Sequence, residues 1–210
     1  HAYSTVNAEA SLQSASVIKA FIMAAVFDKL VYTDGATEPS SDYESSLKSL
    51  LTQMITVSDN DAANELARRL GGGDFHKGAS VLNEFCQEHG YTSTHLGREF
   101  LASNPTDDNY TSASDCCRLL SDIYSGTMVN ADASADMLAL LKAQTRTGKI
   151  PSGVPSGVET ANKTGELSAG DGLGIVENDI AIVFDKEHPY VLCVLSNNIQ
   201  NNSSAQETIK

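Results

Sequence analysis

Residues 14–27 read SASVIKAFIMAAVF, a polar start followed by an apolar run that is long enough for a buried helix. Within this stretch Ser16 and Lys19 are three positions apart, which places both side chains on one face of a helix. A lysine that enters an apolar site loses its charged form more easily, so Lys19 could act as a base toward Ser16. The structural alternative is a capping serine beside a lysine whose ammonium group reaches out to solvent.

The Ser-x-x-Lys pattern alone has little weight, because the chain contains a second copy of it. This copy, Ser45 and Lys48, stands in a polar helical segment, and we interpret it as a chance match. The apolar run that follows Lys19 distinguishes the first copy from the second.

The composition limits the classes of function. The 210 residues include 14 basic and 27 acidic side chains, and the formal net charge of -13 argues against nucleic acid or an anionic membrane as the main partner. No run reaches the ~18 apolar residues of a membrane span, and no signal peptide is recognisable at the start, so we expect a soluble chain. The length is sufficient for one domain with a sizeable core.

The four cysteines are too few for a disulfide scaffold and include no C-x-x-C pair. Cys86 and the neighbours Cys116 and Cys117 lie in two helix-like segments, so a single bridge from Cys86 to one of them is possible if the protein is exported. Buried thiols, Cys193 included, are the alternative. The spacing of these cysteines and His89 does not match the tight ligand pairs of zinc sites, so we predict no metal.

Hydrophobic periodicity predicts a helical front and middle followed by a strand-rich end. Apolar residues recur at helical spacing, with caps, in six segments: 16–32, 42–58, 61–70, 75–89, 112–126 and 132–144. Val- and Ile-rich segments predict strands at 158–163, 174–184 and 190–198, and residues 2–8 could form a further strand. Residues 96–111 lack a period and contain Pro, Asn and Asp, which predicts a long surface loop.

Two further short motifs lie downstream of Ser16. Ser58-Asp59-Asn60 falls at the junction of two predicted helices, and Lys163-Thr164-Gly165 lies on a predicted strand. Each alone has a structural interpretation, as a helix cap and as a strand that ends in a turn. Their occurrence together, and in this order after Ser16, favours a catalytic site.

Together the three motifs resemble the S-x-x-K, S-D-N and K-T-G set of the penicillin-recognising serine enzymes, that is, class A β-lactamases and penicillin-binding proteins. The resemblance extends from residue 14 to about residue 198, because SDNDAANELARRLG and NDIAIVF are also similar to the family's flanking segments. It implies an α+β fold of the β-lactamase/transpeptidase type within a single catalytic domain, residues 1–210. An all-α lobe would comprise about residues 33–150, and an α/β lobe with an antiparallel sheet about residues 1–32 and 151–210. Compared with the family, the chain looks trimmed at both ends, with less strand before the serine and no closing helix.

The resemblance assigns catalytic roles to three residues. Ser16 would be the acylated nucleophile, Lys19 its general base, and Ser58 the group that relays the proton to the leaving nitrogen. No cofactor and no metal is implied.

The resemblance also assigns residues to substrate binding. Asn60 would hold the substrate's amide side chain, and Lys163 and Thr164 would bind its carboxylate. Gly165 would let the substrate lie against the strand. The backbone N–H of Glu166, with that of the nucleophilic serine, would form the oxyanion hole.

One family motif is altered. Class A β-lactamases carry a loop motif R-x-E-x-x-L-N, whose Glu activates the water that hydrolyses the acyl-enzyme. The matching segment here is REFLASN, residues 98–104, so Glu99 comes one residue early and Phe100 takes the aligned place. Glu99 is therefore either a displaced deacylating carboxylate or a surface side chain, and Asp107 and Asp108 are possible substitutes.

These observations favour an active-site serine hydrolase of the class A β-lactamase type, which forms an acyl-enzyme on Ser16 with β-lactams and could hydrolyse them. A D-Ala-D-Ala carboxypeptidase or penicillin-binding protein with slow deacylation is the first alternative, and a non-catalytic β-lactam or muropeptide sensor domain is the second. The resemblance further implies a monomer that binds a small-molecule β-lactam or D-Ala-D-Ala peptide. It also implies an extracytoplasmic location, because peptidoglycan lies outside the cytoplasm.

Overall fold

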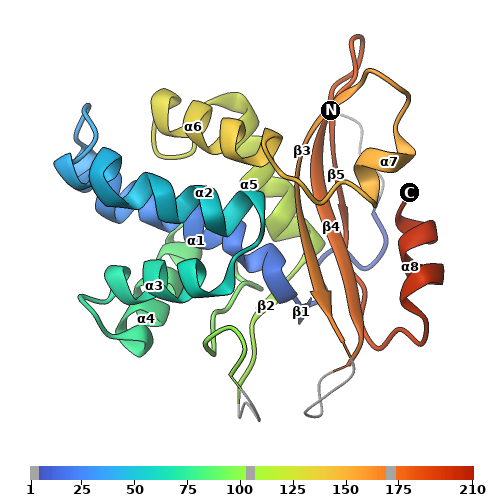
Figure 1. Cartoon of the computed structure of the whole chain (residues 1–210), viewed down its shortest axis with the longest axis horizontal. Helices are drawn as coiled ribbons and strands as arrows, with labels where there is room; N and C mark the ends of the chain where they lie inside the picture. Colours follow the sequence, from blue (N-terminus) through green and yellow to red (C-terminus); the bar gives the residue numbers. More distant parts are fainter. Residues whose placement is uncertain (1–4, 103–106, 169–173) are drawn as a thin grey trace.

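A group of helices lies beside an antiparallel sheet in the computed structural model, which describes residues 5–102, 107–168 and 174–210 (Figure 1). The helices are α1 (Lys19–Val26), α2 (Lys48–Thr56), α3 (Asn60–Leu70), α4 (Phe75–Glu88), α5 (Ala113–Ser125), α6 (Ala131–Lys142), α7 (Ile150–Gly153) and α8 (Asn202–Ile209). Four short segments of 3-10 or π helix lie before α1 or between α1 and α2: η1 (Ala15–Ile18), η2 (Phe27–Val31), η3 (Thr33–Gly35) and η4 (Tyr43–Leu47). The strands are β1 (Leu12–Gln13), β2 (Tyr110–Thr111), β3 (Glu159–Leu167), β4 (Val176–Phe184) and β5 (Tyr190–Val194).

The predicted α+β fold is confirmed, and the six predicted helices and three predicted strands all form. The further strand predicted over residues 2–8 does not form at residues 5–8, which are irregular, and residues 2–4 lie outside the described residues. The expectation that a closing helix is missing is wrong, because α8 forms. Its sequence gives a weak apolar signal, since Ile209 is its one buried residue.

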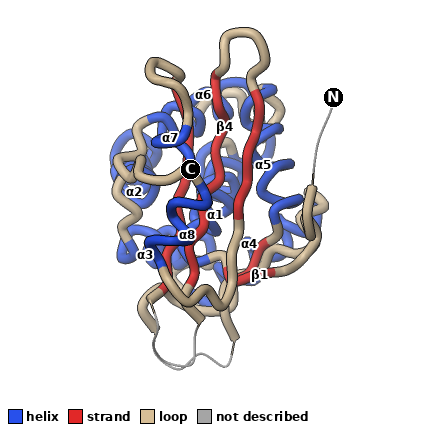
Figure 2. The backbone as a smooth tube through the Cα atoms, turned by 90° about the vertical axis from the view of Figure 1, so that its right-hand side faces the viewer, coloured by secondary structure: helices blue, strands red, loops and turns tan. Residues whose placement is uncertain are grey.

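The sheet has the strand order β3-β4-β5, and β3 pairs with β4 over its whole length, with Thr164 opposite Asp179. Helices α5 and α6 pack on one side of the sheet, and α7 and α8 contact it from the other side (Figures 1 and 2). This arrangement buries the central strand β4 except at its last residue. β3 is the edge strand that faces η1, so the sheet brings its edge to the start of α1.

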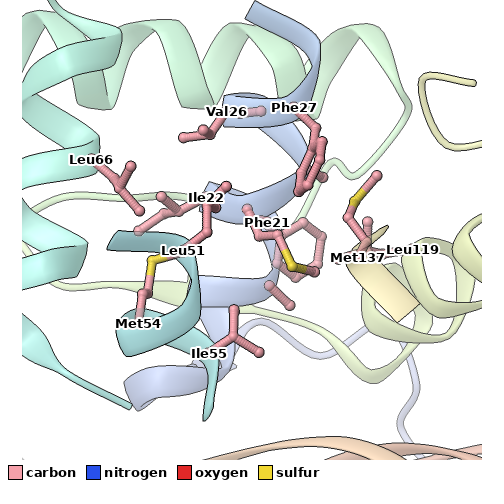
Figure 3. Close-up of a cluster of buried hydrophobic side chains, with 14 of the residues drawn as sticks. Phe21, Ile22, Val26, Phe27, Leu51, Met54, Ile55, Leu66, Leu119 and Met137 are labelled. Carbon is pink, nitrogen blue, oxygen red and sulfur yellow. The ribbon is translucent and has the colours of Figure 1, made fainter. Parts of the chain in front are cut away.

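Helix α1 lies in the middle of the helical core, and all of its residues are buried. Figure 3 shows the apolar side chains around it, which come from α2, α3, α5 and α6: Leu51, Met54, Ile55, Leu66, Leu119 and Met137. The apolar run AFIMAAVF therefore has no polar face, and Lys19, the residue directly before it and the first of α1, is buried. The division into two lobes stays a prediction, and α1, which that prediction assigns to the α/β lobe, packs against α2, α3 and α4.

Two short strands connect the segment before Ser16 to the loop at 96–111. β1 pairs antiparallel with β2, and the N–H of Ser14 donates to the carbonyl of Asn109 over 2.9 Å. The segment before the serine is thereby attached to the far end of the loop.

No helix in the described parts of the chain is long and apolar enough to cross a membrane.

Phe21→Ala is expected to lower the free energy of unfolding by about 3–5 kcal/mol, because it removes a fully buried ring from the centre of the core. The ring packs edge-on against Tyr91, with 5.4 Å between centroids. Urea denaturation followed by circular dichroism measures the change. Val6→Ala is the control, since Val6 is 86% exposed and its loss should change stability by less than about 0.5 kcal/mol. Equal effects of the two substitutions would contradict the central place of α1.

Candidate active site

Ser16 lies in η1, a tight turn directly before α1. The preceding residue, Ala15, has φ of 47°, in the left-handed region that a residue with a Cβ rarely adopts. Hydrogen bonds from neighbouring elements hold this turn: the N–H of Ser14 donates to Asn109, and the Ser14 carbonyl accepts from Asn178 Nδ2 over 3.2 Å. The strained backbone therefore has support on both sides, and Ser16 is half-buried at the wall of a pocket.

Lys19 is fully buried and its ammonium group is surrounded by oxygen acceptors. Nζ donates to the Ser58 carbonyl over 2.7 Å, to Ser58 Oγ over 3.3 Å and to Asn60 Oδ1 over 2.7 Å. Burial lowers the pKa of Lys19 to about 7; Asp59 opposes this shift and the Arg146 cation adds to it. A lysine with this pKa is partly neutral at pH 7 and can accept a proton.

Ser58 Oγ accepts hydrogen bonds from two lysines. Lys163 Nζ donates to it over 2.9 Å, and Lys19 Nζ donates from the other side. Because both lone pairs of the hydroxyl are then used, its own hydrogen is available for a third group. Lys163 is fully buried, and burial together with repulsion from Lys19 holds its pKa well below the usual range. Ser58 has φ of 63°, so its backbone is also in the left-handed region.

Gly165 allows β3 to approach the turn that carries Ser16. A Cβ at this position would lie 2.7 Å from the Ser14 carbonyl oxygen, which is closer than such atoms come in proteins, and 3.1 Å from the Ser16 nitrogen, which is also a tight contact. Only glycine fits between strand and turn. The neighbouring Thr164 is buried, and its Oγ1 has no hydrogen-bond partner among the described residues.

Glu166 follows Gly165 and lines the pocket, and its carboxylate is held by two cations. Lys149 Nζ lies 2.8 Å from Oε1, and Arg146 Nη1 lies 3.6 Å from Oε2. Lys149 is itself buried and also pairs with Glu177 over 2.8 Å. The negative charge at this end of the pocket is therefore balanced by nearby cations.

Glu99 does not line the pocket, and Phe100 occupies the place beside Lys19. Glu99 Oε1 accepts from Arg68 Nη2 over 2.7 Å, whereas the Phe100 ring centroid lies 4.6 Å from Lys19 Nζ. Asn64 fixes Phe100 through its backbone: the N–H of Phe100 donates to Asn64 Oδ1 over 2.9 Å, and Asn64 Nδ2 donates to the Phe100 carbonyl over 3.2 Å. An apolar ring thus covers the side of Lys19 that faces the loop.

The two other acidic side chains considered in the loop are also paired. Asp107 Oδ2 lies 2.6 Å from His95 Nε2 on the surface. Asp108 lines the pocket, but its carboxylate accepts from Arg98 Nε over 2.6 Å and from Gln13 Nε2 over 2.7 Å. The Arg98–Asp108 pair joins the two ends of the loop. Residues 103 and 104 of the altered motif lie outside the described residues.

The pocket itself lies between η1, the start of α3, the loop and the end of β3. Its lining residues are Ala15, Ser16, Asn60, Arg98, Phe100, Leu101, Asp108, Asn109, Glu166 and Leu167. Asp108 and Glu166 are the carboxylates in this lining, and both are ion-paired. The described part of the chain contains no group of three or more His, Cys, Asp or Glu side chains placed to hold a metal ion.

The second Ser-x-x-Lys copy, Ser45 and Lys48, has different surroundings from the first. Ser45 is exposed and donates within its own helical segment, to the Ser41 carbonyl over 3.3 Å, and Lys48 pairs with Glu44 over 2.8 Å. Neither Ser45 nor Lys48 lines the pocket.

Three further residues contribute to the candidate site and are not predicted from the sequence: Asn64, Arg146 and Lys149. Asn64 lies one helical turn after Asn60 on α3, on the same face of the helix, and binds the backbone of Phe100. Arg146 and Lys149 lie in an irregular segment before β3, and their partner Glu166 is on the strand. No pattern in the sequence signals that pairing.

Comparisons with known proteins extend these findings. A family model described as "Beta-lactamase enzyme family" matches residues 1–210. Beta-lactamase 3 of Bacillus cereus is 28% identical over 212 residues, which cover 95% of this chain and 64% of that protein. The β-lactamase of Bacillus licheniformis is 31% identical over 180 residues, which cover 80% of this chain and 53% of that protein. The chain therefore spans less than two thirds of these relatives.

Solved structures show the same fold. The β-lactamase from Sphaerobacter thermophilus DSM 20745 superposes with a TM-score of 0.76 at 21% identity, over 97% of this chain and 81% of that chain. The structure of PBP-A gives a TM-score of 0.76 at 24% identity, over 96% of this chain and 78% of that chain.

Proposed function

Because the chain belongs to the β-lactamase enzyme family, we propose that it is an active-site serine enzyme that β-lactams acylate on Ser16 and that releases the acyl group slowly. The observation that carries this proposal is the buried network in which Lys19 and Lys163 both donate to the Ser58 hydroxyl. Such a network supplies a base of lowered pKa and a hydroxyl with a free proton, which are the two groups that acylation of a serine by an amide requires.

In the proposed acylation step, neutral Lys19 takes the proton of Ser16 Oγ, and the oxygen attacks the β-lactam carbonyl carbon. The ring C–N bond then breaks, and the nitrogen takes the free proton of Ser58. Ser58 recovers a proton from protonated Lys19, with which it shares a hydrogen bond. Backbone N–H groups of Ser16 and Glu166 would stabilise the negative charge on the carbonyl oxygen.

Substrate binding would use the remaining residues at this end of the site. Asn60 lines the pocket beside Ser16 and is proposed to bind the amide side chain. Lys163 and Thr164 are proposed to bind the substrate's carboxylate, which is supported by Thr164 Oγ1, a buried atom that no described residue hydrogen-bonds. Gly165 brings the strand to the nucleophile, so a substrate between them would contact both.

Slow release is proposed because deacylation needs a water molecule and a base to activate it. Phe100, an apolar side chain, lies against Lys19, where the altered motif would otherwise offer a carboxylate. Glu99 is bound to Arg68, and Asp108 and Glu166 are held by their own cations. None of these carboxylates is positioned to act as a free base.

The buried network around the Ser58 hydroxyl also favours a second candidate function, cleavage of D-Ala-D-Ala peptides, in which the acyl-enzyme also forms on Ser16. A sensor domain that is acylated and never turns over has the same first step. We propose in either case an extracytoplasmic monomer, as expected for an enzyme that meets β-lactams and peptidoglycan.

Intact-mass spectrometry of the protein mixed with benzylpenicillin, followed over time, tests the proposal. An adduct of one penicillin that persists for hours is expected. An adduct that disappears within seconds would contradict slow release and indicate a fast β-lactamase. Release of D-Ala from a model peptide would assign the peptidase, and a lasting adduct without any such release would assign the sensor.

Acylation is expected to depend on pH through Lys19. Its pKa is lowered to about 7, so the neutral base is lost as the pH falls below 7. The second-order rate constant of adduct formation should therefore decrease about tenfold per pH unit below pH 7 and level off above it. Arg146→Gln should move the midpoint to higher pH, because it removes a cation that lowers this pKa. A flat profile between pH 5.5 and 8.5 would exclude Lys19 as the base.

A further inference from the structure

Two thiols from distant parts of the sequence meet where α5 packs against the sheet. Cys117 is on α5 and Cys193 is on β5, and these two elements contact each other. The two thiols are close enough for each to shift the pKa of the other, and both are half-buried. We propose that Cys117 and Cys193 form a disulfide that links α5 to β5 when the protein meets a disulfide oxidant.

The other two cysteines are placed differently. Cys86 is buried on α4, and Cys116 is buried on α5, where its sulfur lies 3.6 Å from Thr111 Oγ1. All four thiols are free in the structure, so the bridge considered from Cys86 to Cys116 or Cys117 is not formed. Adjacent residues on a helix point about 100° apart. Cys116 is fully buried beside Thr111, whereas the half-buried Cys117 is the cysteine whose pKa Cys193 lowers.

The environment of the pair gives the two thiols different roles. The hydrogen bond from Cys193 lowers the pKa of Cys117, whereas burial raises that of Cys193 well above its usual value. Cys117 is therefore the sulfur that reacts first. Its thiolate attacks one sulfur of a small disulfide such as oxidised glutathione and releases one glutathione thiol. Cys193 then loses its proton and attacks the Cys117 sulfur, which releases the second glutathione.

The overall reaction exchanges the disulfide of the oxidant for a disulfide in the protein. Two protein thiols are oxidised, one molecule of oxidised glutathione is reduced to two thiols, and the protein loses two hydrogen atoms. The new bond would close the chain between residues 117 and 193, which contains α6, α7, β3 and β4. Closing a loop of this length restricts the unfolded chain and stabilises the fold.

The test treats the folded protein with oxidised glutathione, unfolds it in denaturant that contains iodoacetamide to block the remaining thiols, and maps disulfides by mass spectrometry of a non-reduced digest. We expect two blocked cysteines, Cys86 and Cys116, and one peptide pair joined through Cys117 and Cys193. The oxidised protein should melt about 10 °C higher than the reduced protein. Four blocked cysteines, or a bond that maps to Cys86 or Cys116, would overturn the proposal.

Two variants make the test independent of the melting temperature. Cys193→Ser should retain a single glutathione on Cys117, because the second step is blocked, whereas Cys117→Ser should react more slowly at Cys193. The double variant should show no change in melting temperature with oxidant. An unmodified Cys117 in Cys193→Ser would contradict the assigned order. None of these results depends on acylation of Ser16.

Discussion

Lys19→Met is expected to slow the acylation of Ser16 by about 10²- to 10⁴-fold, because it removes the base that takes the serine proton. Lys19 is fully buried at the start of α1, and methionine fills a similar volume without a charge. The fold should therefore persist, which circular dichroism and thermal melting would check. The rate of adduct formation with benzylpenicillin, measured by rapid quenching and intact-mass spectrometry, reports the loss.

Lys19→Arg is the matched control for the charge of this side chain. Arginine keeps a cation near Ser58 and Asn60 but does not lose its proton near neutral pH. If Lys19 acts as a base, Lys19→Arg should be about as slow as Lys19→Met. If Lys19→Arg reacted at the rate of the unsubstituted protein, the lysine would serve as a cation only, and the proposed proton transfer would be wrong.

Phe100→Glu is expected to accelerate deacylation by about 100-fold or more, because it places a carboxylate beside Lys19 where a water molecule could be activated. The ring that it replaces lies 4.6 Å from Lys19 Nζ, and its backbone is held by Asn64 on both sides, so the new side chain should start from the same position. The lifetime of the penicillin adduct, measured from the decay of its mass signal, tests this expectation.

Phe100→Gln is the control that distinguishes the effect of the new base on deacylation from the effect of the space that a smaller side chain opens. Glutamine has the shape of glutamate but cannot take a proton, so the adduct of this variant should remain long-lived. A carboxylate near Lys19 should also raise the pKa of the lysine, so acylation of Phe100→Glu should be slower than that of the unsubstituted protein at pH 6. Equally rapid release by both variants would show that access of water, and not the missing base, limits deacylation.

The sequence predicted the helical core, because strong local signals determine it. The apolar run after Lys19 has no polar face, and the structure buries all of α1. Ser16–Lys19 lies at the start of α1 and Ser58–Asn60 at the start of α3, whereas Lys163–Gly165 lies inside β3. In the structure Lys19 and Lys163 contact the same Ser58 hydroxyl.

Side-chain direction in the loop could not be predicted in the same way. An irregular segment has no period, so the sequence left open whether Glu99 or another carboxylate faces the nucleophile. The direction is fixed by contacts with α3, in which Arg68 binds Glu99 and Asn64 binds the backbone of Phe100. The contact between Cys117 and Cys193 was missed for a related reason, since it depends on how α5 packs on β5 and not on any local pattern.

The most direct test of the central claim is to locate the acyl group. The protein is incubated with benzylpenicillin, digested, and its peptides are analysed by tandem mass spectrometry. The account predicts that Ser16 carries the penicilloyl group, that Ser16→Ala forms no adduct, and that Ser45→Ala, which alters the second Ser-x-x-Lys copy, is labelled as fast as the unsubstituted protein. A penicilloyl group on any other residue, or an adduct that survives in Ser16→Ala, would contradict it.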